Sequence, residues 1–461
     1  MKNNVSLTSF GAAQTVTGSK HLLRTPELTI LIDCGLFQGI KELRLKNWQP
    51  PEVNPAEVDV VIITHAHLDH CGYLPLFVKN GFRGRILMTP PTAELAAIIL
   101  KDSAEIQEED AEKVNKYGYS KHAIAKPLYT VKDAERAIAQ FETVEHSVSV
   151  QLSDNVDVVF RKNGHILGAC SACLSVYGKS IVFSGDIGRY DSDLLLPPSH
   201  IGDADFVVME STYGARLHQE EDVFECLAKI INKTIWKGGT VLIPCFAVGR
   251  AQELMHAINQ LKQESRIPHH LPVFLDSPMA AEATDVLSRY PHWHKLTAEQ
   301  CKRVCHEVII NKDWHGTEKI MNDKGPKIIL SASGMLSGGR ILEYVKHYAP
   351  HTHHTILLVG YQAEGTRGRA LQNGSRILKI HGKSVQVNAR VETISSLSAH
   401  ADQSELIKWL DTAFSRKPEK IFLVHGDHDA QQVLKNKLIE ERGMDVYIPQ
   451  QNEEIKLFST E

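Results

Sequence analysis

The densest group of potential metal ligands in the chain is the segment HAHLDH, at 65–70. It follows the apolar run VDVVIIT, which is typical of a buried strand, so these ligands are expected where a strand ends and a loop begins. With this spacing, His65 and His67 would face one metal. Asp69 and His70, which open the next helix, would face a second. Zinc binds imidazole and carboxylate and keeps one position open for water when it is catalytic, so the segment predicts a catalytic zinc site.

HAHLDH is also the signature of the metallo-β-lactamase superfamily, which this chain resembles in further motifs that follow in order. Asp33 in LIDCG matches an aspartate that supports the metal loop by orienting a metal-bound histidine. His165 in NGHILGA and Asp186 in FSGDIG match the third histidine ligand and the carboxylate that bridges two metals. The resemblance implies two zinc ions per chain. One would be held by His65, His67, His165 and Asp186, and the other by Asp69, His70, Asp186 and a histidine from the C-terminal part.

The elements that must position these ligands fall into three stretches. Residues 1–212 alternate short apolar runs with turn residues, which predicts strands ending in loops, and a helical pattern lies between about 91 and 141. Residues 213–380 alternate strands with helices, as in a parallel, helix-covered sheet. Residues 381–461 predict strand, helix, strand and helix. This pattern predicts an α/β protein. The resemblance implies that 1–212 and 381–461 form a metallo-β-lactamase αββα sandwich, with 213–380 inserted as a second α/β domain.

An insertion of roughly 170 residues after the bridging aspartate resembles the β-CASP nucleases. This branch includes the endonuclease of eukaryotic pre-mRNA 3′-end processing and, more distantly from this chain, bacterial RNase J. Its motifs A, B and C match Glu210 in VVMESTYG, His400 in SLSAHAD and His425 in LVHGDHD. RNA-processing members carry a histidine at motif C that completes the second zinc, whereas DNA-processing members typically carry an aliphatic residue. His425 therefore favours RNA.

The resemblance implies hydrolysis of phosphodiester bonds by a two-metal hydroxide mechanism that leaves 5′-phosphate and 3′-hydroxyl ends. Two neighbouring zinc ions lower the pKa of a bridging water toward neutrality and polarise the phosphoryl oxygen. Asp69 would orient the resulting hydroxide. His400 is the candidate general acid for the leaving oxygen, with Glu210 holding its ring in the protonated form. The alternative is that His400 only caps the helix that starts near Asp402.

Candidate RNA contacts lie within the inserted domain. Ser333 and Gly334, in SASGMLSGGR after the strand KIIL, place backbone N–H groups where a phosphate can bind, although this is also the composition of an ordinary strand-to-helix turn. Arg367 and Arg369 begin a basic run that extends to residue 390 without an acidic residue, and the alternative is a pair of exposed strands with basic faces. Arg250, in CFAVGRAQE, would contact phosphate or pair with a carboxylate of its own helix.

The bulk composition narrows the class of protein. A chain of 461 residues with 43% hydrophobic residues has enough apolar surface for one or two large cores. A net charge of −4 does not suit a protein that coats nucleic acid by electrostatics alone. The first residues carry no apolar signal segment, and no stretch approaches the ~18 apolar residues of a membrane span. We expect a cytoplasmic protein without membrane contact, whose eight cysteines are reduced.

The predicted function is therefore a zinc-dependent ribonuclease that acts on single-stranded RNA. Three alternatives remain: a DNA-directed β-CASP nuclease, which only His425 disfavours; an inactive scaffold protein, which missing ligands would support; and a small-molecule hydrolase of the same fold, which the insertion disfavours. The sequence does not decide between internal cleavage and cleavage from an end, and it leaves the oligomeric state, including a homodimer, open.

Overall fold

The chain folds into two compact units, one of which is inserted into the other. Unit 1 comprises Met1–Leu217 and His400–Glu461, and unit 2 comprises His218–Ala399. The structure is a computed structural model that describes residues 3–117, 124–219, 221–360, 362–363, 365–394 and 396–460. The insertion expected from the sequence is therefore present.

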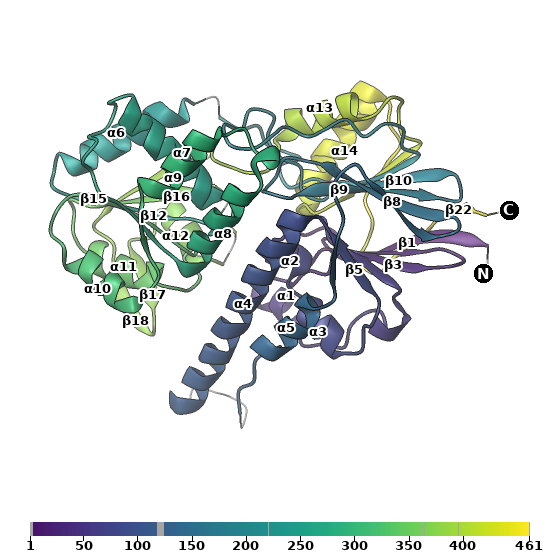
Figure 1. Ribbon diagram of the computed structural model, residues 1–461, viewed down its shortest axis with the longest axis horizontal. Coiled ribbons are helices and arrows are strands. Elements are labelled where there is room, and N and C mark those ends of the chain that lie inside the picture. Colours follow the sequence, from purple (N-terminus) through teal and green to yellow (C-terminus); the bar gives the residue numbers. More distant parts are fainter. Residues whose placement is uncertain are drawn as a thin grey trace. The chain divides into compact units, whose positions relative to one another are not determined.

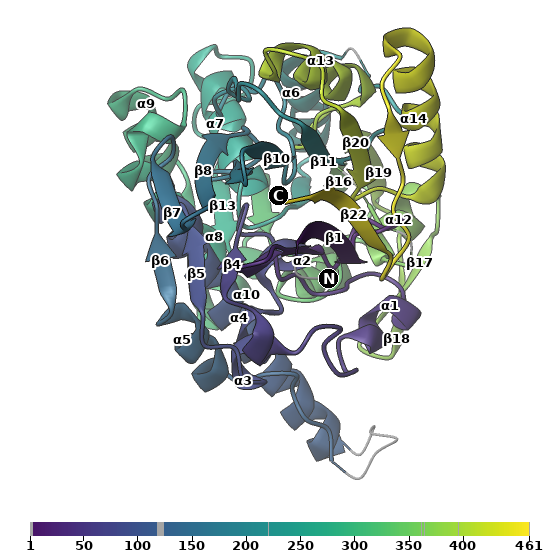
Figure 2. The ribbon, with the colours of Figure 1, turned by 90° about the vertical axis from the view of Figure 1, so that its right-hand side faces the viewer.

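Unit 1 is built on two seven-stranded sheets among its described residues. The first runs in the order β22 (Glu454–Ser459), β1 (Asn4–Gly11), β2 (Lys20–Arg24), β3 (Thr29–Ile32), β4 (Val60–Ile62), β5 (Arg85–Met88) and β6 (Phe141–Thr143). The second runs in the order β21 (Val446–Tyr447), β20 (Lys420–Val424), β11 (Phe206–Glu210), β10 (Lys179–Phe183), β9 (Cys170–Val176), β8 (Val156–Lys162) and β7 (Ser149–Ser153). Because β22 pairs antiparallel with β1, the first and last strands of the chain lie side by side (Figure 2).

Helices cover the outer faces of both sheets of unit 1. Figure 1 shows α3, α4 and α5 against the first sheet and α13 and α14 against the second, which is the αββα sandwich predicted from the sequence. A buried cluster that includes Trp409 of α13 and Leu434 of α14 packs against β10, β11 and β20. The helical segments are α1 (Lys41–Lys46), η1 (Pro55–Glu57), α2 (Leu68–Cys71), α3 (Leu74–Lys79), α4 (Pro90–Tyr117), α5 (Val131–Ile138), α13 (Gln403–Ala413) and α14 (His428–Arg442).

Unit 2 contains a six-stranded sheet in which all described strands run parallel, as the alternation of strands and helices predicts. Its order is β14 (Ile309–Asn311), β13 (Val273–Asp276), β15 (Lys327–Ser331), β12 (Thr240–Pro244), β16 (Thr355–Val359) and β19 (Arg390–Ile394). The central strands β12, β15 and β16 are buried along their whole length, because helices cover both faces.

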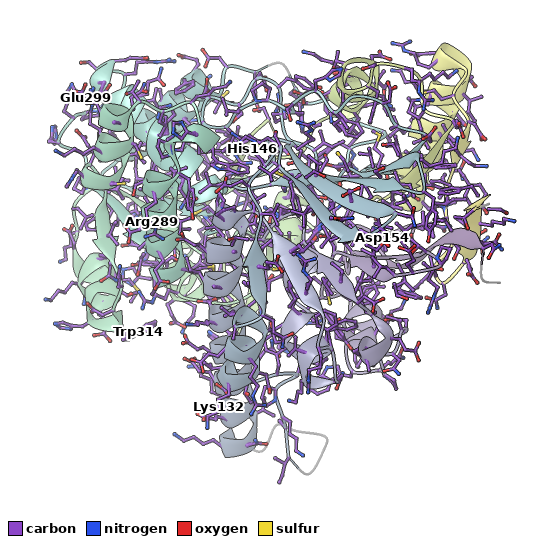
Figure 3. All side chains as sticks on the ribbon, turned by 45° about the vertical axis from the view of Figure 1, so that its right-hand side comes forward. Lys132, His146, Asp154, Arg289, Glu299 and Trp314 are labelled. Carbon is purple, nitrogen blue, oxygen red and sulfur yellow. The ribbon has the colours of Figure 1, made fainter. Side chains whose placement is uncertain are left out.

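The helical segments of unit 2 follow the strands in regular alternation. They are α6 (Val223–Ile235), α7 (Arg250–Gln263), α8 (Pro278–Arg289), η2 (Pro291–Trp293), α9 (Ala298–His306), α10 (Trp314–Asn322), α11 (Ile341–Tyr348) and α12 (Arg367–Gln372). A separate antiparallel hairpin joins β17 (Ile377–Ile380) to β18 (Lys383–Gln386). Trp314 opens α10 with its indole 48% exposed and marks the rim of unit 2 in Figure 3.

The return from unit 2 to unit 1 lies later than the boundary at residue 380 drawn from the sequence. Strand β19 pairs in parallel with β16, and this places residues up to Ala399 in unit 2. Periodicity identifies a strand but not its pairing partner, so the sequence alone did not place the strand at 390–394 beside β16.

No helix in the described ranges is both long enough and apolar enough to cross a membrane.

Candidate metal centre

The potential metal ligands of unit 1 lie just beyond the carboxyl ends of parallel strands. In the first sheet β3 pairs in parallel with β4, so Asp33 and Thr64–His65 follow neighbouring strand ends. In the second sheet β11 pairs in parallel with both β10 and β20. Asp186 follows β10, Glu210 ends β11, and His425 follows β20. Parallel pairing therefore gathers residues that are up to several hundred positions apart in the sequence.

Three histidines and one carboxylate form what we call the first donor group: His65, His67 and His165, with Asp186 beside them. The Nδ1 atom of His67 lies 3.0 Å from His65 Nε2 and 3.1 Å from His165 Nε2. Asp186 Oδ2 lies 3.5 Å from the Nε2 atoms of both His65 and His165. Four ligands held tetrahedrally about 2.1 Å from one zinc ion would be about 3.4 Å from each other. The donor atoms therefore fit one zinc ion.

The second donor group consists of Asp69, His70 and His425. The Nε2 atoms of His70 and His425 are 3.2 Å apart, and His425 Nε2 lies 3.5 Å from Asp69 Oδ2. The remaining oxygen of Asp186, Oδ1, lies 3.3 Å from His70 Nε2. This oxygen is buried and makes no hydrogen bond with any described residue. Asp186 thus presents one oxygen to each donor group, and the two groups together fit two metal ions that share this carboxylate.

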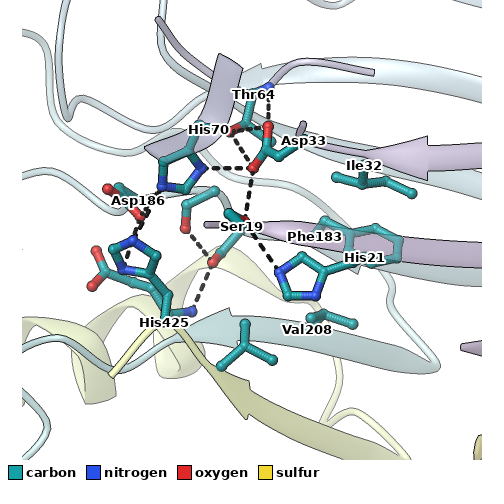
Figure 4. A pocket seen from close by; sticks show the side chains of 14 residues that line it. Ser19, His21, Ile32, Asp33, Thr64, His70, Phe183, Asp186, Val208 and His425 are labelled. Carbon is teal, nitrogen blue, oxygen red and sulfur yellow. Dashed lines mark hydrogen bonds and ion pairs between the residues drawn. The ribbon is translucent and has the colours of Figure 1, made fainter. Parts of the chain in front are cut away.

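Asp33 orients the second donor group without facing a metal itself. Its Oδ1 accepts hydrogen bonds from Thr64 N (2.9 Å) and Thr64 Oγ1 (3.0 Å), and its Oδ2 lies 2.7 Å from His70 Nδ1 (Figure 4). Because a carboxylate only accepts, His70 Nδ1 carries a proton, and Nε2 is the nitrogen left to face the other potential ligands. Gly35 allows the Asp69 loop to approach closely, since a Cβ there would lie 1.7 Å from the Asp69 carbonyl oxygen.

Two site residues adopt a left-handed backbone that non-glycine residues rarely use. Asp33 has φ of 59° and His425 has φ of 46°. Both are held by backbone hydrogen bonds, from Asp33 N to the Ile62 carbonyl (2.8 Å) and from His425 N to the Ala12 carbonyl (2.7 Å). Such conformations cost about 1–3 kcal/mol and persist where the surrounding structure imposes them, often at functional sites.

Burial sets the protonation of the first donor group. It lowers the pKa of His67 to about 4 and the pKa of His65 well below its usual range. Both imidazoles are therefore neutral at pH 7, which is the state that binds zinc. For His70, burial also lowers the pKa, but the carboxylates of Asp186 and Asp33 outweigh it and raise the pKa well above the usual range. Metal binding at the second donor group would therefore release a proton from His70.

Glu210 and His400 stand beside the first donor group. The Oε1 atom of Glu210 accepts from Ile187 N (2.6 Å) and from His400 Nδ1 (3.2 Å), so Nδ1 carries a proton. The other ring nitrogen, Nε2, faces Asp186 Oδ2 at 3.9 Å. Burial lowers the pKa of His400, but the charges of Glu210 and Asp186 outweigh it and raise the pKa to about 9. The two carboxylates thus favour the protonated form of His400.

The position of His400 is set by the start of α13. An antiparallel bridge joins it to Gly188, and Ala401 N donates to the Ile187 carbonyl (2.8 Å). Asp402 then caps α13 through a capping box with Glu405. The helix cap therefore belongs to Asp402, and the His400 ring is directed to the donor groups instead.

The residues predicted to contact RNA lie in unit 2. Ser333 and Gly334 follow β15, where Ser333 Oγ accepts from Ser337 N (3.2 Å) and the Gly334 carbonyl accepts from Gln362 Nε2 (3.3 Å). A Cβ at Gly334 would lie 3.1 Å from Phe246 Cδ2, so glycine permits a close approach. The turn is well ordered by its own hydrogen bonds.

The arginines predicted to contact phosphate already have partners within unit 2. Arg250 is buried at the first position of α7 and pairs with Glu253. Arg367 donates to the carbonyls of Leu336 (3.0 Å) and Lys379 (2.8 Å). Arg369 donates to Gln372 Oε1 (3.1 Å). The geometry of Arg250 is that of the carboxylate-pairing alternative, and Arg367 holds the turn of Ser333 in place.

Sequence reasoning missed several residues that contact the ligands. Thr64 and Thr212 bind Asp33 and His425, with Thr212 Oγ1 lying 3.1 Å from His425 Nδ1. Each lies within two residues of a predicted site residue, and this proximity in the sequence could have identified both threonines as candidates. Ser19, just before β2, and His21, within β2, also belong to the hydrogen-bonded group around Asp33, and no ligand motif pointed to them.

Comparison with family profiles agrees with this architecture. Residues 18–232 match the metallo-beta-lactamase superfamily, residues 251–371 match the Beta-Casp domain, and residues 384–449 match the Zn-dependent metallo-hydrolase RNA specificity domain. Among solved structures, a crystal structure of a protein of unknown function from Enterococcus faecalis V583 covers 98% of this chain and is itself fully covered, with a TM-score of 0.54 and 13% identity. That likeness concerns the fold alone.

Curated relatives match over nearly the whole chain. Ribonuclease TTHA0252 of Thermus thermophilus is 35% identical over 95% of this chain and 96% of its own length. The transcription termination factor FttA of Methanocaldococcus jannaschii is 33% identical over 92% of this chain and 67% of its own length. The RNase J-like protein of the same organism is 32% identical, with 92% and 93% covered. The chain belongs to the β-CASP branch of the metallo-β-lactamase superfamily.

Proposed function

We propose that this protein is a zinc-dependent ribonuclease that hydrolyses phosphodiester bonds of single-stranded RNA and leaves 5′-phosphate and 3′-hydroxyl ends. The observation that carries the proposal is the position of Asp186, whose two oxygens face different donor groups and whose Oδ1 is buried without a hydrogen bond. A shared carboxylate between two sets of histidines suits a pair of zinc ions. One ion would be held by His65, His67, His165 and Asp186, and the other by Asp69, His70, Asp186 and His425.

Two bound zinc ions would supply an activated water near neutral pH and neutralise charge on the phosphate. The rest of the chemistry falls to the protein. Asp69 Oδ2 lies 3.5 Å from His425 Nε2 and is placed to orient the attacking water as its oxygen forms the new bond to phosphorus. His400 is placed to give its Nε2 proton to the 3′ oxygen as the P–O3′ bond breaks.

Glu210 supports this role of His400. It accepts the Nδ1 proton of His400, while its own carboxylate is fixed by Ile187 N (2.6 Å) and Thr212 N (3.2 Å). A carboxylate held by two backbone N–H groups keeps the imidazole ring in one orientation and stabilises its charged form. Glu210 is thus a positioning residue for the general acid.

RNA is favoured over DNA by two observations. His425 supplies the histidine at motif C and lies within the second donor group, 3.2 Å from His70. The relatives include a ribonuclease and a transcription termination factor, and residues 384–449 match a Zn-dependent metallo-hydrolase RNA specificity domain. In unit 2 the backbone of Ser333 and Gly334 and the side chain of Arg369 are the proposed phosphate contacts, whereas Arg250 and Arg367 would act by holding this region in shape.

The test is cleavage of 5′-labelled single-stranded RNA beside DNA of the same sequence, with zinc-loaded wild type and His400→Ala. We expect RNA-selective cleavage that yields 5′-phosphate ends and falls by about 10²–10⁴-fold in His400→Ala, because a general acid contributes about that factor. Zinc content should stay unchanged, since His400 is not in either donor group. His200→Ala, which removes an exposed histidine of unit 1, is the matched control and should retain full activity.

Other results would point elsewhere. Equal or preferred cleavage of DNA would contradict the inference of RNA selectivity from His425 and would favour a DNA nuclease. If zinc-loaded wild type cuts neither polymer, the scaffold and small-molecule alternatives gain support. The pattern of labelled fragments separates internal cleavage from stepwise removal at an end.

A further inference from the structure

A line of buried polar side chains runs from the second donor group into the strands of the first sheet. His70 Nδ1 meets Asp33 Oδ2 at 2.7 Å, and Ser19 Oγ donates to the same oxygen at 3.4 Å. Ser19 Oγ also lies 3.2 Å from His21 Nε2, and His21 Nδ1 lies 2.9 Å from Ser9 Oγ. These side chains are at most 4% exposed. Figure 4 shows Ser19 between His21 and Asp33.

The direction of every hydrogen bond in this line follows from counting protons. Asp33 as a carboxylate can only accept, so the single hydroxyl proton of Ser19 goes to Asp33. Ser19 Oγ must then accept from His21, which places the proton of His21 on Nε2. A neutral imidazole has one N–H, so His21 Nδ1 accepts from the hydroxyl of Ser9. One arrangement satisfies all of the groups, and it leaves His70 Nε2 facing the second donor group.

His21 is neutral, as this arrangement requires. Burial, with a smaller effect from His70 and His425, lowers the pKa of His21 to about 3. Apolar side chains, among them Phe183 and Val208, line the same small cavity, whose free volume is about 10 Å³. The ring of His21 packs 6.3 Å from that of Phe183. A polar side chain in such surroundings is costly unless its hydrogen bonds are made, so its presence calls for a reason.

The sheet, and not the metal, fixes the position of His21. In the antiparallel pairing of β1 with β2, His21 lies directly opposite Ser9, and in the pairing of β2 with β3 it lies opposite Ile32, next to Asp33. All three strands belong to the core of unit 1. The line of hydrogen bonds therefore connects His70 to the paired strands of this sheet.

We propose that His21, acting through Ser19 and Asp33, is a positioning residue that sets the tautomer and orientation of His70 and thereby strengthens zinc binding at the second donor group. The inference rests on the proposed function for the identity of the metal. Partners beyond the ligands commonly change metal affinity about 10–100-fold. Two hydrogen bonds, through Ser19, connect the ring of His21 to Asp33, and the bond between Ser19 and Asp33 is long (3.4 Å). We therefore expect an effect at the lower end of this range, about tenfold.

The experiment measures zinc affinity at each donor group separately, by competition with a chromophoric chelator. His67→Ala disables the first donor group and reports on the second, and His425→Ala does the reverse. We expect His21→Phe to weaken zinc binding about tenfold in the His67→Ala background and to leave it unchanged in the His425→Ala background. His21→Gln, whose amide nitrogen can replace imidazole Nε2 as the donor to Ser19, should restore most of the affinity.

Controls separate this effect from a loss of folding. Ser6→Ala removes another buried hydroxyl of β1, one that donates to Glu454 (2.9 Å), and should leave zinc affinity unchanged in both backgrounds. If His21→Phe does not fold, as judged by circular dichroism, Ser19→Ala interrupts the same line with a smaller change and should weaken the second donor group alone. Equal loss in both backgrounds, or no loss in either, would overturn the proposal.

The readout also separates this inference from the proposed function. Wild type that binds two zinc ions but cleaves no RNA would reject the ribonuclease assignment and leave the role of His21 testable by affinity alone. Wild type that cleaves RNA while His21→Phe keeps full zinc affinity would reject only the role of His21.

Discussion

Two buried carboxylates at strand ends, Asp186 in unit 1 and Asp276 in unit 2, have opposite surroundings. Asp276 ends β13 with its side chain fully buried and accepts hydrogen bonds on both oxygens. The donors are Asn311 Nδ2 (2.8 Å), Arg340 Nη1 (2.6 Å), Thr317 Oγ1 (2.7 Å) and Tyr344 Oη (2.5 Å). Asp186 is as deeply buried, yet its Oδ1 makes no hydrogen bond with the described residues, and its neighbours are imidazole nitrogens.

The difference shows that a place at a strand end does not by itself make a functional site. Around Asp276 every acceptor faces a donor, including a guanidinium that neutralises the charge, so the network is complete without a ligand. Around Asp186, atoms of the kinds that bind metals face one another at 3.0–3.5 Å, and a cation would complete such an arrangement. The partners of a carboxylate therefore separate a structural role from a metal-binding one.

The largest effect is expected for Asp186→Asn. An amide cannot bridge two cations as a carboxylate does, so zinc content should fall and RNA cleavage should drop by more than about 10⁴-fold, because most of an acceleration of at least about 10⁶-fold would depend on the metals. Zinc per chain by mass spectrometry and the rate of RNA cleavage measure the two effects. If Asp186→Asn retains both zinc ions, the distinction between a metal-binding Asp186 and a structural Asp276 is wrong.

Asp276→Asn is the matched change in unit 2 and should act on stability alone. Removing the charge leaves the guanidinium of Arg340 without its buried partner, and breaking such a pair costs about 3–5 kcal/mol. Hydrogen exchange followed by mass spectrometry should show faster exchange in β13 and β15, with zinc content unchanged. A loss of zinc in this variant would show that Asp276 serves the metal centre, contrary to the distinction drawn here.

The candidate metal centre was predictable because its potential ligands lie in short, dense motifs. HAHLDH places four ligands within six residues, and the remaining ligands follow in a recognisable order, so the residues that the structure brings together had been named from the sequence. The parallel sheet of unit 2 was predicted from the alternation of strands and helices, and the αββα sandwich from the resemblance that these motifs carry. These features depend on local sequence, which is why they could be predicted.

Features that depend on pairing between distant segments could not be predicted. Nothing in PVFLDS marks Asp276, because its partners come from residues 35 to 68 positions later. The proposed role of His21 depends on its register with Ser9, and the end of unit 2 depends on the pairing of β19 with β16. The positive charges of Arg250 and Arg367 led to the prediction that they bind phosphate. Only the structure shows that Arg250 pairs with Glu253 and that Arg367 donates to backbone carbonyls.

A third carboxylate, Asp205, sharpens the comparison because it lies in unit 1 but has complete partners. It is buried just before β11, and it accepts from Ser180 N (2.7 Å), Arg416 Nη2 (2.8 Å) and Lys179 Nζ (3.3 Å). Burial raises its pKa, but the hydrogen bond from Ser180 and the two cations outweigh burial, so the pKa is lowered. If the hydrogen-bond and ion-pair partners of a buried carboxylate determine its role, and its location does not, the role of Asp205 should be structural, like that of Asp276.

We therefore expect Asp205→Asn to lower the free energy of unfolding by about 1–2 kcal/mol at pH 7, with no effect on zinc content. Because the folded pKa lies below the unfolded value of about 3.9, this stabilisation is present above that pH and is lost as the pH falls through the folded pKa. Urea unfolding from pH 7 down to pH 3 should show the stabilities of wild type and variant converging.

Asp154→Asn, at the exposed turn between β7 and β8 in Figure 3, is the control and should change stability by less than about 0.5 kcal/mol. A constant gap between wild type and Asp205→Asn across this range would mean that the charge of Asp205 is not what stabilises the fold.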